Sequence, residues 1–177
     1  MTKLLGSLAL TAMTLALTPR AALADDVDTI RGSFAVAFSS TPNAGNVAYC
    51  GGTALPTAVE AHGDGYSTLG PLSFSLQKTS GGGLFHGCLT LTAPNGDVLT
   101  ATYDAQGNSP NANHFSSANG KLTFTGGTGQ FSGARGNAEF TAVFVQFYPL
   151  SSFVGGTSAP LQGMAFYLVE GTVSTHE

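Results

Sequence analysis

KLTFTGGTGQFSGARGNAEF, residues 121–140, is the stretch of sequence that decides the fold. A strand is predicted to end at Thr125, and Ala134-Arg135-Gly136 leads into the next strand. Between them, three glycines tolerate positive φ and allow a tight corner: Gly126, Gly127 and Gly129. Phe131 is placed to plug the end of a barrel. Phosphate binding by this loop is disfavoured, because no Lys-Ser/Thr pair follows and no helix is predicted behind it.

Outward from this corner, short segments rich in Phe, Val, Leu and Thr recur between glycine-containing turns. No helical apolar period is visible after residue 24. Asn95-Gly96 favours a hairpin turn. The predicted strands cover residues 30–39, 57–62, 67–78, 84–93, 98–103, 121–125, 138–148 and 164–175, and the predicted loops cover 106–120 and 150–163. The fold class is therefore all-β, an eight-stranded antiparallel closed barrel, with a two-sheet β-sandwich as the alternative that fits the same strand count.

The N-terminal segment has the layout of a secretory signal peptide. Lys3 precedes a short apolar run, and Ala22-Leu23-Ala24 offers small residues at the cleavage site. We therefore expect a signal peptide over residues 1–24 and a single barrel domain over 25–177, secreted or periplasmic and outside the membrane after cleavage. Residues 25–177 hold four basic and ten acidic side chains, a net charge of −6. This balance argues against a nucleic-acid partner, which would require a basic patch.

The two cysteines, Cys50 and Cys88, are predicted to form a disulfide, as an even count in an exported protein suggests. Their spacing makes a poor zinc site, since there is neither a CxxC pair nor a nearby pair of histidines. We expect neither a metal nor a cofactor.

The glycine motif at residues 126–140 resembles the GGTGxFxxARG segment of the dirigent proteins and the matching turn of the allene oxide cyclases. Residues 59–66 and 95–103 are similar to two further dirigent segments, and residues 67–70 and 95–97 resemble pieces of bacterial secreted proteins. The resemblance implies an eight-stranded barrel, often trimeric, that guides the coupling of phenoxy radicals with acidic, Tyr and Arg side chains in its lumen. The motif itself is structural, so we expect Arg135, its one transferable residue, to bond loop carbonyls.

The remaining candidate ligand-binding residues come from strand alternation. Glu60 and His62 share one face of an extended segment with Asp64, where a carboxylate can tune a histidine, although a solvated outer face is the plainer alternative. Carboxylates within apolar strands would be functional if they faced the lumen, and ordinary if they faced outward. Tyrosines in the strands could line a lumen as hydrogen-bonding aromatics. These candidates are Glu139, Glu170, Tyr103 and Tyr167.

Two functions fit these observations. In the first, the barrel binds a small apolar or aromatic molecule and steers its cyclisation or coupling. In the second, a barrel filled by side chains acts as a non-catalytic interaction module. Either function is compatible with a homo-oligomer, a dimer or a trimer. A lumen cavity of roughly 300 Å³ or more with converging Tyr, Glu or Arg side chains would favour the first function, and a lumen packed with Phe, Val and Leu the second. The sequence leaves open whether the protein is an enzyme.

Overall fold

The computed structural model describes residues 26–147 and 161–175. The predicted signal peptide and most of the predicted loop 150–163 lie outside the described residues. The described chain consists of eight strands and their connections, with one short 3-10 turn, η1 (Gly129–Phe131). The strands are β1 (Asp26–Pro42), β2 (Thr57–Ser67), β3 (Gly70–Gly81), β4 (Leu84–Thr92), β5 (Val98–Gly107), β6 (Phe115–Gly127), β7 (Arg135–Phe147) and β8 (Leu161–Thr175).

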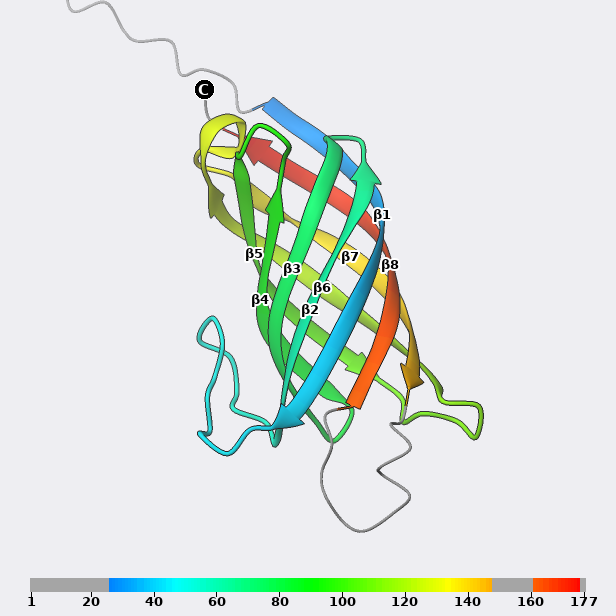
Figure 1. Ribbon diagram of the computed structural model, residues 1–177. Coiled ribbons are helices and arrows are strands. Elements are labelled where there is room, and N and C mark those ends of the chain that lie inside the picture. The colour runs from blue at the N-terminus through cyan, green and yellow to red at the C-terminus, as the bar shows by residue number, and fades with distance from the viewer. Residues whose placement is uncertain (1–25, 148–160, 176–177) are drawn as a thin grey trace, which may run out of the picture.

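The eight strands form one closed antiparallel barrel in chain order (Figure 1). Each strand pairs with the next, and β1 also pairs with β8 from Asp26 opposite Thr175 to Ser40 opposite Leu161. The predicted closed barrel is therefore confirmed, and the β-sandwich alternative is wrong. Closure leaves no sheet edge exposed along these strands, which removes a site of edge-to-edge aggregation.

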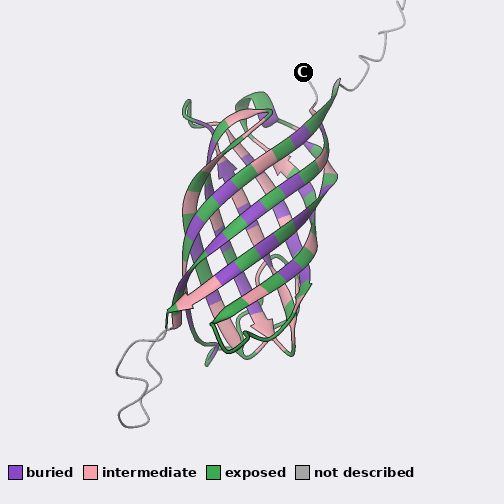
Figure 2. Ribbon diagram, turned by 90° about the vertical axis from the view of Figure 1, so that its right-hand side faces the viewer, coloured by how far each residue is buried: buried purple, intermediate pink, exposed green. Residues whose placement is uncertain are grey.

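Side chains alternate between the lumen and the outside, and Figure 2 shows this as bands of buried and exposed residues along each strand. In β3, for example, Leu72, Phe74 and Leu76 are buried, whereas Ser73 and Gln77 are exposed. The lumen is filled along much of its length by aromatic and aliphatic side chains. Phe34 and Tyr167 both lie against the Phe74 ring there, with centroid distances of 5.4 and 5.0 Å.

The glycine corner closes one end of the barrel. Gly129 has φ +55°, and an added Cβ there would collide with the Asp97 carboxylate, which accepts a hydrogen bond from the Gln130 backbone N–H at 3.0 Å. Phe131 is buried beneath this corner. The sequence thus places a hairpin turn and a glycine motif, thirty residues apart, in direct contact to cover the lumen.

Strand β6 begins well inside the segment predicted as the loop 106–120, and β5 continues into its start, so this prediction is wrong for residues 106–107 and 115–120. The segment is rich in small and polar residues, which we interpreted as a loop. In the barrel its small residues face inward, with Ala118 buried and Gly120 beside Phe140. A Cβ on Gly120 would lie 2.5 Å from the Phe140 ring, so the missing side chain leaves room for that ring to stack at 4.6 Å on Tyr103.

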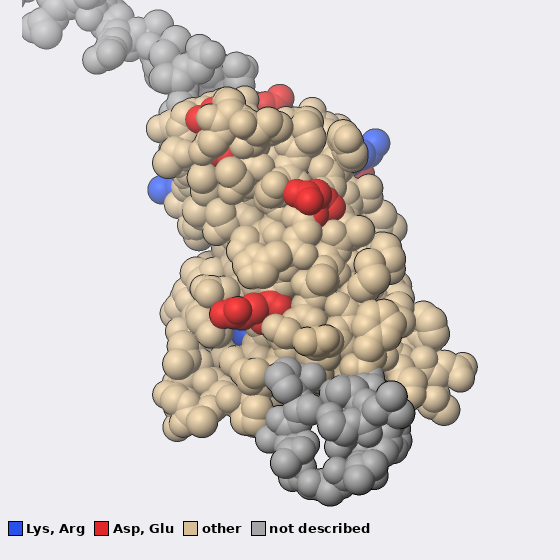
Figure 3. Space-filling model, viewed as in Figure 1, with Lys and Arg blue, Asp and Glu red and all other residues tan. Residues whose placement is uncertain are grey.

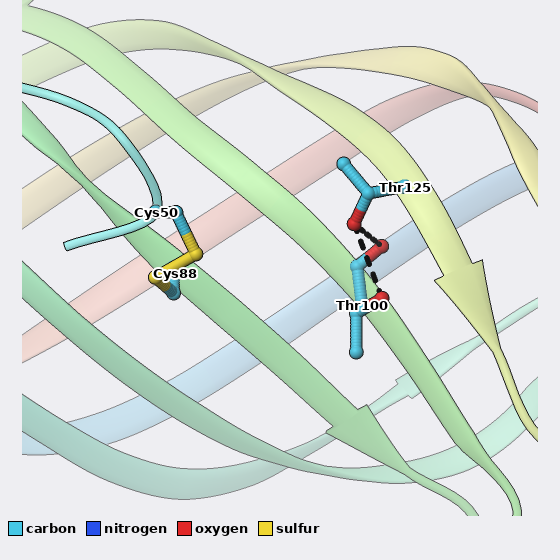
Figure 4. The surroundings of a disulfide bond; sticks show 4 residues. All are labelled: Cys50, Cys88, Thr100 and Thr125. Carbon is cyan, nitrogen blue, oxygen red and sulfur yellow. Dashed lines mark hydrogen bonds between the residues drawn. A yellow bond between two sulfur atoms is a disulfide. The ribbon is translucent and has the colours of Figure 1, made fainter.

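The predicted disulfide between Cys50 and Cys88 is confirmed (Figure 4). It joins the connection between β1 and β2 to the outer face of β4, and the two cysteines have a sequence separation of 38. A second pair of side chains in Figure 4, Thr100 and Thr125, links β5 to β6 through hydroxyl contacts at 3.1 and 3.3 Å, next to an irregularity in the register of these strands.

In the part of the chain that the structure describes, no helix has the length and apolar character needed to cross a bilayer.

Candidate functional site

A pocket of about 260 Å³ enters the lumen at the end of the barrel opposite the glycine corner. This end carries the last residues of β1 and β3 and the first residues of β2 and β8, at the bottom of Figure 1. Its walls include three phenylalanines, and small hydroxyl-bearing residues add polar atoms. The lining residues used below are Phe38, Lys78, Ser80, Phe85, Phe144 and Tyr167.

Lys78 is the most unusual residue of this pocket. It lies on β3 one alternation beyond Leu76, so its side chain faces the lumen and is only 2% exposed. Its Nζ lies 4.5 Å from the Phe85 ring centroid, 4.8 Å from that of Phe144 and 5.0 Å from that of Tyr103. Within the described residues this nitrogen has no hydrogen-bond partner and no carboxylate pairs with it.

Burial lowers the pKa of Lys78 to about 7, because the charged ammonium loses its hydration inside the barrel. The three aromatic faces attract a cation, but such contacts offset only part of the desolvation cost. Near neutral pH, therefore, a large fraction of this amine carries no proton and keeps its lone pair. Neutral lysine side chains in apolar surroundings are the form used in carbonyl chemistry by proteins.

Two of the predicted candidates, Tyr103 and Tyr167, are inside the lumen near this amine. Burial raises the pKa of the Tyr103 phenol well above its usual range, with a smaller contribution from Tyr167, and burial also raises the pKa of Tyr167. Both phenols therefore stay protonated at physiological pH. The rings meet edge to face at 6.4 Å, and the Tyr103 hydroxyl makes no hydrogen bond of regular geometry within the described residues.

The other predicted candidates lie away from the lumen. Glu60 and His62 are exposed on the outer face of β2. Glu139 and Glu170 face each other across β7 and β8 on the outside, where Glu170 accepts a hydrogen bond from Arg31 at 2.9 Å. Both partners of that ion pair are about two-thirds exposed, so it contributes little to stability.

Arg135 lies at the opposite end of the barrel from the pocket. Its guanidinium donates to the backbone carbonyls of Thr125 at 2.6 Å and Ala134 at 2.7 Å. These bonds fix the two strands that flank the glycine corner, the arrangement expected from the motif.

Sequence reasoning missed Lys78, although the signal was present. The alternation of Leu72, Phe74 and Leu76 continues to position 78, which puts the lysine on the inward face. We interpreted the charged residue as the end of the strand, but β3 continues to Gly81. The aromatic side chains around the amine come from β4, β5 and β7, and only the barrel register brings them together.

No cluster of three or more His, Cys, Asp or Glu side chains able to hold a metal ion occurs within residues 26–147 and 161–175.

Comparisons with known proteins find a likeness in structure and none in sequence. No protein-family profile matches the chain, and no curated protein matches it at a significant level. A solved structure of a pterocarpan synthase dirigent protein is similar over 96% of this chain and 100% of its own, with 14% identity and a TM-score of 0.45. The closed barrel follows from the strand pairing of the chain itself.

The depressed pKa of Lys78 predicts a specific pH dependence of stability. The unfolded lysine binds a proton below about pH 10.5 and the folded one only below about 7, so the buried amine destabilises the fold progressively as the pH falls between these values. Lys78→Met should raise the free energy of unfolding by about 3 to 5 kcal/mol at pH 6 to 7 and by little above pH 10.5. Urea unfolding of both proteins across this range measures the difference, and a gain that does not vary with pH would contradict the assignment.

Proposed function

We propose that the protein binds a small, largely apolar or aromatic molecule in the pocket at the open end of the barrel. The observation that carries this proposal is the buried Lys78 amine, which lines an open pocket without a partner among the described residues. An unsatisfied buried polar group costs free energy, and proteins retain such groups where a ligand or reaction uses them.

At about 260 Å³ the pocket is slightly smaller than the roughly 300 Å³ set above as favouring a ligand site, and its volume suits a small molecule of one or two rings. An engineered apolar cavity of about 150 Å³ in another protein already binds benzene, and this pocket measures about 260 Å³. Phe144 stacks nearly parallel on Phe85 at 6.2 Å and meets Phe38 edge to face at 6.0 Å. These rings offer faces and edges to an aromatic ligand, while the lysine and the serines supply a few polar contacts, as small-molecule sites usually do.

The pocket also supports a role in steering a reaction. A ligand held between fixed aromatic walls has few orientations, and a cyclisation or coupling of that ligand would start from the orientation held. We infer a secreted or periplasmic location from the predicted signal peptide, and the disulfide is consistent with an oxidising compartment. The sparse charge of the surface in Figure 3 fits recruitment of an uncharged molecule.

Ligand binding is tested with 2-naphthol, a fluorescent aromatic alcohol. The protein should bind it saturably, and Ser80→Phe, which places a ring in the pocket, should weaken binding by about tenfold or more, a loss of ~1.4 kcal/mol. Gln77→Phe adds the same ring to the exposed face of the same strand and should leave the affinity unchanged. If the Ser80→Phe variant bound 2-naphthol as tightly as the unsubstituted protein, the pocket would not be the binding site.

A second candidate function is self-association through an apolar outer face. Large apolar side chains are exposed side by side on β7 and β8, where Val143 lies opposite Phe166 and Leu168 is 65% exposed. The face also includes Met164 and Phe147. Contiguous apolar patches of this kind mark interaction sites on soluble proteins. A second copy of the chain is the partner that we propose.

Self-association is measured by sedimentation velocity of the protein without residues 1–24. We expect a dimer or trimer, and the double change Phe166→Ser with Leu168→Ser should shift it to monomer. Leu84→Ser removes a similarly exposed leucine from β4, across the barrel, and should leave the assembly intact. A monomeric parent protein at all concentrations would refute this second function.

A further inference from the structure

The surroundings of the Lys78 Nζ point to a reacting group. Within the described residues the buried Lys78 Nζ has no hydrogen-bond partner, and the buried Tyr103 hydroxyl makes no hydrogen bond of regular geometry. The nitrogen lies among three aromatic rings and belongs to a residue of the pocket wall. A structural lysine would satisfy its ammonium with a carboxylate or carbonyls, and this one does neither within the described residues.

We propose that Lys78 condenses reversibly with the carbonyl group of a small aromatic aldehyde or ketone to form an imine in the pocket. This inference rests on the proposed function, because the carbonyl compound occupies the same pocket. It extends that function by naming the substrate class, and it makes the ligand covalently held.

The reaction is balanced without an oxidant or reductant. The Nζ lone pair attacks the carbonyl carbon, the C=O π pair moves to oxygen, and a proton passes from nitrogen to that oxygen to give a carbinolamine. The nitrogen then expels the hydroxyl group and loses its second proton, so amine and carbonyl become imine and one water. The pocket is open at the barrel mouth, which gives this water a route out.

The environment favours a carbonyl compound over a carboxylate. Because burial lowers the Lys78 pKa to about 7, much of the amine is a nucleophile at neutral pH. Attack on a carbonyl carbon uses the neutral amine. An ion pair with a carboxylate would instead require Lys78 to be protonated inside the desolvated lumen. The residues beyond the predicted signal peptide carry a net charge of −6, which also opposes the approach of an anion.

Lys121 provides an internal control, because it is the other lysine beyond residue 24. It lies exposed on β6, opposite Asp104 on one neighbouring strand and Glu139 on the other. An ordinary lysine, with a pKa of about 10.4, is unprotonated in fewer than about one molecule in a thousand at pH 7. Selective chemistry at Lys78 would therefore reflect the lumen and not lysine reactivity in general.

The test is reductive trapping with cinnamaldehyde and sodium cyanoborohydride at pH 7, followed by peptide mapping. We expect one reduced cinnamyl group per chain on Lys78, with labelling of Lys121 lower by more than about tenfold. Lys78→Met should abolish this adduct, and Lys121→Arg should preserve it. The peptide map of the labelled protein without substitutions locates the adduct by itself. The test therefore remains decisive even if Lys78→Met does not fold.

Absence of a Lys78 adduct, or labelling of Lys121 to the same extent as Lys78, would overturn the inference, whereas labelling of the terminal α-amine, which is partly unprotonated at pH 7, is expected in any case. Cinnamyl alcohol, which lacks the carbonyl, separates this failure from that of the proposed function. If the alcohol binds and Ser80→Phe blocks its binding, but the aldehyde leaves no adduct on Lys78, the pocket binds a ligand and the proposal of an imine at Lys78 is wrong. If neither molecule binds, both fall.

Discussion

The pairing of β1 with β8 is the constraint on which the rest of the structure depends. This ladder runs from Asp26 to Ser40 on β1 and converts a meander of hairpins into a closed wall. Once the wall is closed, alternate side chains along each strand face the lumen or the outside. Lys78 faces the lumen for this reason, since its strand is fixed in register by Leu76 and by neighbours on both sides.

The two ends of the barrel are built differently, and the difference locates the site. At one end, Asp97 and the glycine corner lie in contact over the buried Phe131 ring. At the other, small side chains such as Ser80 leave space beside the Phe144 ring, and the pocket forms there. Desolvation of the Lys78 amine opposes folding. Burial of the aromatic side chains between the two ends stabilises the fold and offsets this cost.

Much of the fold could be predicted from the sequence, since strand alternation, the Asn95-Gly96 turn and the glycine corner are local signals. The disulfide could be predicted from the even number of cysteines in a chain with a predicted signal peptide. Strand ends were harder, because β6 begins among small polar residues that also suit a loop. There, Gly120 has a role that becomes visible only with the Phe140 ring packed above it.

The site was harder to predict from the sequence, because it depends on which strands face one another across the lumen. Alternation alone makes Tyr103 and Tyr167 candidates, and both are in the lumen. The same reasoning applied to Glu139 and Glu170 leaves the choice of face open, and the structure places them outside. The three aromatic rings around the Lys78 Nζ come from β4, β5 and β7. No spacing along the chain predicts that these strands bring them together.

The amine of Lys78 lies inside the barrel, desolvated and facing an open pocket. NMR titration of protein carrying ¹³C at the lysine ε positions tests it directly, because residues 25–177 hold two lysines. We expect the Lys78 signal, assigned by its loss in Lys78→Met, to titrate near pH 7 in the folded protein. A Lys78 signal that titrates near 10.5, as for a lysine in water, would contradict it.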